Sequence, residues 1–65
     1  MTPKYSNIKV VLVGEDDNAF AILARVEMAL RKAEVPEDEI KAFYENATSG
    51  DYDHLLQVVM QTVDV

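Results

Sequence analysis

The sequence predicts a small α+β domain in which one strand precedes three helices, a β-α-α-α order that is mainly helical. Three observations support this within 65 residues. A short β-branched run, residues 8–13, ends at Gly14. Apolar residues then recur every three or four positions from Ala19 onward. Two later segments, over residues 35–50 and 51–63, repeat that helical spacing and begin and end at helix-capping residues.

Residues 8–13 are expected to form the strand, because both of their alternating sets are largely apolar, with Lys9 the exception. That pattern is typical of a strand covered on both faces. Residues 1–7 contain Pro3 and show no periodicity, so we expect a loose N-terminal arm. The remaining residues, 8–65, then form one domain.

A single strand leaves backbone hydrogen-bonding groups without partners along its edges. Residues 1–5 or 62–65 of the same chain could supply them, and so could the same strand of a second copy or the sheet of another protein. We favour the second copy, which would place Val11 and Val13 in an interface.

The first helix is expected to begin after Asp17 or Asn18, either of which can accept hydrogen bonds from the first free amides. Its main apolar stripe predicts the buried face, and its members are Ala19, Ile22, Leu23, Val26, Ala29, Leu30 and Ala33. A second, narrower apolar strip consists of Phe20, Ala24 and Met28. This strip is either covered by the other helices or forms a contact surface for another chain, where the small Ala24 permits close approach.

The second helix is expected to begin near Pro36, with Val35 packing on Ile40 as a hydrophobic staple. We expect it to end at Gly50 in a left-handed conformation. Asp51 follows and can cap the third helix.

The composition limits the partners of the chain. It carries 12 acidic and 6 basic residues, a net charge of −6, and its basic residues are scattered, which disfavours direct nucleic-acid binding. No apolar run is long enough to span a membrane or to act as a secretory signal, so we expect a soluble, cytoplasmic protein. A domain this small has a stability margin of only about 3–5 kcal/mol. Cysteine is absent, which rules out disulfides, so a partner chain is the common remaining aid.

The acidic turn Glu15, Asp16 and Asp17 is the first candidate for chemistry, since carboxylates are the ligands that Mg²⁺ and Ca²⁺ prefer. Helix capping explains the same residues, and the spacing matches neither an EF-hand nor a phosphate-binding loop. A small metal- or ligand-binding domain is therefore an alternative, and no cofactor is expected.

A second candidate combines Asp51, Asp53 and His54, because carboxylates near a histidine can form an acid–base pair or a metal site. Consecutive helix positions face different directions, so capping is the simpler interpretation. His54 is the single histidine, and Ser6 and Ser49 lie in poor contexts for a nucleophile. We therefore do not expect this protein to be an enzyme.

The leading hypothesis is a non-enzymatic protein-interaction module that self-associates, as a homodimer, or binds another protein. Its interface residues would be Val11, Val13, Phe20, Ala24 and Met28. Another alternative is an acidic mimic that occupies a nucleic-acid-binding protein.

Two segments, residues 14–20 (GEDDNAF) and 47–56 (ATSGDYDHLL), resemble the signature of a family of small uncharacterised proteins from bacteria and their phages. That pattern has glycine where this chain has Asp17, and often where it has Ala24. The resemblance implies a soluble bacterial or phage setting, and no biochemical function comes with it.

Overall fold

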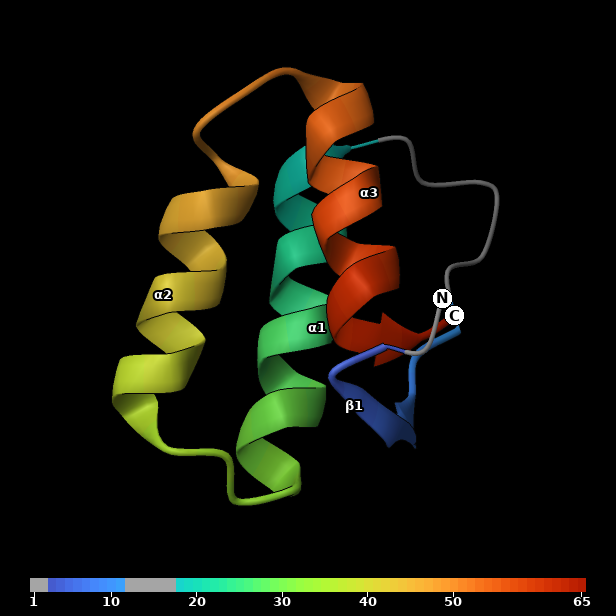
Figure 1. The fold of residues 1–65 in the computed structure, drawn as a ribbon, viewed down its shortest axis with the longest axis vertical. Coiled ribbons are helices and arrows are strands. Elements are labelled where there is room, and N and C mark those ends of the chain that lie inside the picture. The colour runs from blue at the N-terminus through green and yellow to red at the C-terminus, as the bar shows by residue number, and fades with distance from the viewer. Residues whose placement is uncertain (1–2, 12–17) are drawn as a thin grey trace.

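The protein is a small α+β domain, described by a computed structural model over residues 3–11 and 18–65. Strand β1 (Tyr5–Lys9) is followed by three helices, α1 (Ala19–Lys32), α2 (Glu37–Ala47) and α3 (Tyr52–Thr62), as Figure 1 shows. This confirms the predicted β-α-α-α order. A two-residue strand, β2 (Val63–Asp64), extends it at the C-terminal end.

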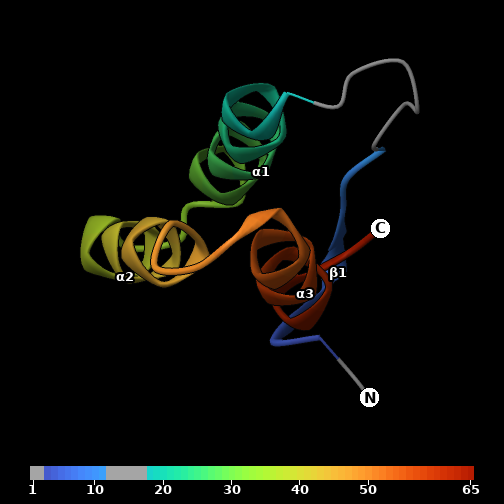
Figure 2. The same cartoon turned by 90° about the horizontal axis from the view of Figure 1, so that it is seen from above.

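The three helices run side by side and alternate in direction, with α2 antiparallel to α1 and α3 (Figure 1). Seen from above, they occupy the corners of a triangle, and β1 lies against α3 (Figure 2). Each helix turns an apolar stripe toward the centre, because its apolar residues recur with the helical period. The buried core residues are Ile8, Val10, Ile22, Leu23, Val26, Leu30, Ile40, Phe43, Ala47, Leu55, Val58, Val59 and Val63. Ala33, expected in the α1 stripe, is instead exposed just beyond the helix.

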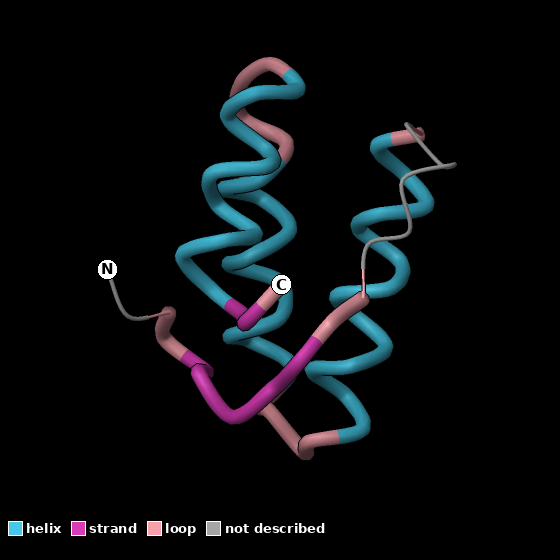
Figure 3. Tube along the Cα trace, turned by 90° about the vertical axis from the view of Figure 1, so that its right-hand side faces the viewer, coloured by secondary structure: helices cyan, strands magenta, loops and turns pink. Residues whose placement is uncertain are grey.

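The strand finds its partner within the chain, so the prediction that it pairs with a second copy is wrong for this edge. β1 and β2 form a two-stranded parallel sheet with an irregular register, in which Tyr5 lies opposite Val63 and Lys9 opposite Asp64 (Figure 3). The Val10 amide donates to the Asp64 carbonyl at 2.9 Å. The pairing is the one that the sequence analysis listed for residues 62–65, but all three helices lie between the two strands in sequence, so short-range patterning could not select it over the other partners.

The strand also begins earlier than predicted, at Tyr5 rather than Ile8, and the expected loose arm over residues 1–7 is therefore wrong for Tyr5–Asn7. The Lys4 amide donates to the Gln61 carbonyl at 2.8 Å, and Lys4 Nζ lies 2.6 Å from Glu39 Oε2 on α2. These contacts hold the start of the strand against the helices although its sequence is polar. The predicted strand residues Val10 and Val11 lie beyond β1, and Leu12 and Val13 lie outside the described residues.

The helix starts follow the predicted capping. Asn18 Oδ1 accepts from the Phe20 amide at 3.0 Å, and Asp51 Oδ1 accepts from the His54 amide at 2.9 Å. Val35 packs against the core immediately before α2, and Pro36 is the N-cap.

The left-handed residue lies at a different helix end from the one predicted. Gly50 does not have a positive φ, whereas Glu34, just after α1, has φ 64°. The Glu34 amide donates to the Arg31 carbonyl and the Val35 amide to the Leu30 carbonyl, each at 3.0 Å. These two bonds form a Schellman motif, which needs a left-handed residue at this position even when it is not glycine.

Candidate interaction surface

The apolar strip of α1 is open to solvent rather than covered by α2 and α3. Phe20 is 73% exposed and Met28 70% exposed, and Ala24, between them, is also exposed. The buried stripe Ile22, Leu23, Val26 and Leu30 occupies the opposite side of the helix. Large apolar side chains left this exposed on one helix face are typical of a contact surface.

Val11 continues this strip beyond the helix. It is 74% exposed, and with Met28 it lines a shallow groove of about 270 Å³ between α1 and the end of β1. The other residues of the groove are Lys9, Val10, Arg25 and Ala29. We call Val11, Phe20, Ala24 and Met28, together with this groove, the α1 surface. Four of the five predicted interface residues belong to it, and the fifth, Val13, lies outside the described residues.

Two cations lie together in the groove of the α1 surface, a feature that the sequence reasoning missed. Lys9 and Arg25 line the groove, and no carboxylate of the described residues does, whereas Asp64 lines the adjoining groove at Val11. Neither residue makes an ion pair with any of the residues that the structure describes. The signal was present in the sequence, since Arg25 falls off the buried stripe and next to Ala24 in the chain, but the position of Lys9 beside it required the fold.

The acidic turn Glu15, Asp16 and Asp17 lies outside the described residues, so the metal-binding alternative stays a prediction. Over residues 3–11 and 18–65, no group of three or more potential ligands gathers to hold a metal ion.

The histidine cluster is a helix-end contact. His54 Nε2 lies 2.8 Å from the Asn46 carbonyl oxygen at the end of α2 and 3.2 Å from Ser49 Oγ. Because a carbonyl oxygen only accepts, Nε2 carries the hydrogen in this arrangement, and Ser49 Oγ donates to the same carbonyl at 2.7 Å. A ring nitrogen that donates cannot take the serine proton, so these two residues do not form a nucleophile–base pair.

His54 and Ser49 instead satisfy a carbonyl that the end of α2 leaves without a helical partner. Asp51 does not reach the ring but caps α3 through the His54 amide. For Asp51 and His54, the structure therefore confirms the simpler interpretation, in which Asp51 caps the helix.

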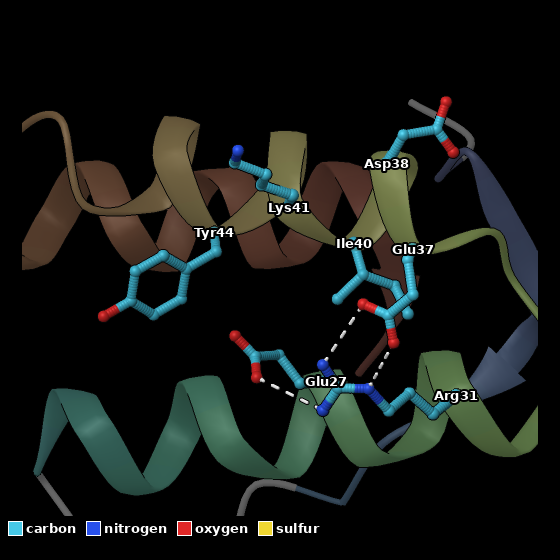
Figure 4. A pocket seen from close by; sticks show the side chains of 7 residues that line it. All are labelled: Glu27, Arg31, Glu37, Asp38, Ile40, Lys41 and Tyr44. Atoms are coloured by element: carbon cyan, nitrogen blue, oxygen red, sulfur yellow. Dashed lines mark hydrogen bonds and ion pairs between the residues drawn. The ribbon is translucent and has the colours of Figure 1, made fainter.

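A larger groove of about 530 Å³ lies between α1 and α2, and Figure 4 shows its lining. Arg31 crosses it: Nε donates to Glu37 Oε1 at 3.0 Å, Nη2 to Oε2 at 3.4 Å, and Nη1 lies 3.8 Å from Glu27 Oε2. Hydrogen bonding and charge from Arg31 lower the pKa of Glu37, and those from Glu37 raise the pKa of Arg31. Two carboxylates already engage Arg31, so it is not available to bind an anion. We interpret the cluster as an ion-pair contact between α1 and α2.

None of the helices in the described parts of the chain has the length and apolar character needed to cross a membrane.

Comparisons of the chain with protein-family models, with curated proteins and with solved structures find no match. The resemblance of residues 14–20 and 47–56 to a bacterial and phage family therefore stays a prediction, as does the acidic-mimic alternative. The candidate function has to be argued from the α1 surface itself.

Proposed function

We propose that the protein is a non-enzymatic interaction module that self-associates through the α1 surface. The observation that carries this proposal is the joint exposure of Val11, Phe20 and Met28, each at least 70% open to solvent. Such exposure leaves a large apolar area in water in a small domain, where only 13 apolar residues of the described parts are buried in the core. A partner chain would remove it from water.

A two-fold dimer is the simplest assembly that covers the surface, because the same patch then serves both copies. Ala24 lies in the middle of the strip, one helical turn from both Phe20 and Met28, and its small side chain lets a partner helix come close. Burying three large apolar side chains from each copy contributes about 10 kcal/mol. The loss of translational and rotational freedom offsets much of this gain. We therefore expect dissociation in the micromolar range.

The absence of a suitable nucleophile–base pair at Ser49 and His54 and the engagement of Arg31 by carboxylates support a non-catalytic role. Both polar clusters serve to join helices. The surface whose side chains lack contacts within the described parts of the chain is the apolar α1 surface.

Sedimentation equilibrium tests the proposal. The wild-type chain should shift from monomer to dimer between about 1 and 500 μM. Met28→Asp should remain a monomer over that range. Met60→Asp is the matched control, because Met60 is an exposed methionine on α3 and away from the α1 surface, and it should dimerise like the wild type. A wild-type chain that stays monomeric throughout would refute self-association.

A further inference from the structure

The two ends of the apolar strip on α1 differ in shape. Phe20, at the end nearer the helix N-terminus, is 73% exposed and has the largest side chain of the strip. Met28, at the other end, lines the groove of about 270 Å³ between α1 and the end of β1. A cavity of about 150 Å³ is enough to hold a benzene molecule, so this groove has room for a phenyl ring. One end of the strip therefore carries an exposed ring, and the other end has a hollow of suitable size.

The walls of the groove suit an aromatic ring. Val10, Val11 and Ala29 supply apolar contacts, and Lys9 and Arg25 lie beside them. Neither cation has a carboxylate within ion-pair distance among the described residues. A cation within about 6 Å of an aromatic ring is attracted to its face, so a ring in this groove would contact both kinds of side chain.

The charges around the strip have both signs, so charge does not select the occupant of this groove. Carboxylates line the neighbouring grooves, and they are Glu27, Glu37, Asp38, Asp51 and Asp64. The occupant has to be identified from shape and from the spacing of the strip.

The spacing of the strip is symmetric about Ala24, which lies four residues from both Phe20 and Met28. Rows of residues at this spacing form ridges on a helix, and in the commonest helix–helix contact the rows of the two helices lie alongside each other. A two-fold axis at Ala24 allows two arrangements. If the helices are parallel, Phe20 meets Phe20 and the two grooves stay empty. If they are antiparallel, each Phe20 lies at the Met28 end of the other copy, where the groove is.

We infer that the two copies pack with their α1 helices antiparallel, and that each inserts Phe20 into the groove beside Met28 of the other. This rests on the proposed self-association, and it adds the orientation of the copies and the residue that anchors them. Both rings are buried at once, because a two-fold axis repeats every contact. Ala24 lies at the axis, where its small side chain lets the two helices approach.

Spin labels measure the orientation without altering the contact. The chain has no cysteine, so Lys32→Cys, at an exposed position outside the strip and at the end of α1, introduces a single labelling site. Lys32 is eight residues from Ala24, about 12 Å along the helix. Pulsed electron–electron double resonance should therefore give a distance between copies of about 20–30 Å for antiparallel helices, against about 15 Å or less for parallel ones. The shorter distance in a dimeric chain would overturn the inference and leave self-association intact.

Filling the groove tests its occupant. Phe20→Ala should weaken dimerisation by about a hundredfold or more, because two rings lose their burial. Ala29→Leu places a larger side chain in the groove and should weaken dimerisation by about tenfold or more. Ala42→Leu, the same change at an exposed alanine of α2, is the matched control and should change the dissociation constant less than about twofold.

The effects of Phe20→Ala and Ala29→Leu should not add. Once the ring is absent, filling the groove removes nothing further, so the double variant should dissociate within about threefold of Phe20→Ala alone. Additive losses, in variants that circular dichroism shows to be folded, would mean that Phe20 contacts another part of the partner and would overturn the inference alone. A wild type that stays monomeric up to about 500 μM would overturn both this inference and the proposed function.

Discussion

A Cβ atom placed on Gly50 would lie 2.9 Å from both Cβ and Cγ of His54. Gly50 is therefore required by the close approach of the His54 ring, and not by a left-handed backbone. The approach matters because His54 Nε2 donates to the Asn46 carbonyl across the same turn, which ties the end of α2 to the start of α3.

Gly50→Ala should lower the free energy of unfolding by about 1–3 kcal/mol, the cost of an extra methyl group in a closed contact. Urea denaturation followed by circular dichroism measures it. In the His54→Ala background the same change should cost less, because Cγ and the ring are gone and only the Cβ contact remains. An equal cost in both backgrounds would mean that the ring is not the obstacle.

Glu34→Gly should stabilise the protein by about 0.5–1 kcal/mol, because glycine adopts a positive φ without the steric penalty that glutamate incurs at 64°. The thermal midpoint should rise accordingly. Glu45→Gly, inside α2, serves as the control and should destabilise by about 1 kcal/mol. A loss of stability in Glu34→Gly would contradict the Schellman geometry.

The Lys4–Glu39 pair should make stability depend on pH in the acidic range. Hydrogen bonding and charge from Lys4 hold the pKa of Glu39 below its ordinary value of 4.5 in the folded protein. The folded state therefore binds the proton less readily than the unfolded state. The pair stabilises above pH 4.5, and this contribution is lost as the pH falls through the folded pKa.

Glu39→Gln should accordingly lower the urea midpoint at neutral pH and flatten its decline between about pH 5 and pH 3. Glu45→Gln removes an exposed carboxylate of α2 that makes no ion pair among the described residues, and it should leave the slope closer to that of the wild type. Identical slopes for the wild type and Glu39→Gln would count against the pair.

Leu30→Ala should remove most of the stability. Leu30 is fully buried where α1 faces the other elements, and such truncations cost about 2–5 kcal/mol. That is comparable to the whole margin of a domain this small. Circular dichroism should therefore show a large unfolded fraction at 25 °C. Met28→Ala, two residues away but exposed, should change the unfolding free energy of the monomer by less than about 0.5 kcal/mol.

Local chemistry was enough to predict the helical part of the fold. Asn18 and Asp51 cap their helices because their side chains reach amides only two or three residues ahead, and such contacts depend on nothing distant. The period of Ile22, Val26 and Leu30 likewise predicts a buried face for any helix that packs at all. The order of the three helices followed from these signals.

The tertiary structure decided what lies far apart in the chain. The pairing of Tyr5 with Val63, and hence the true start of β1, depends on how the intervening helices return the chain, which no short pattern encodes. The exposure of Phe20 and Met28 was equally undetermined, because an apolar strip is buried or open according to where the neighbouring helices cross it. The position of Lys9 beside Arg25 arises in the same way, since only folding brings the end of β1 beside α1.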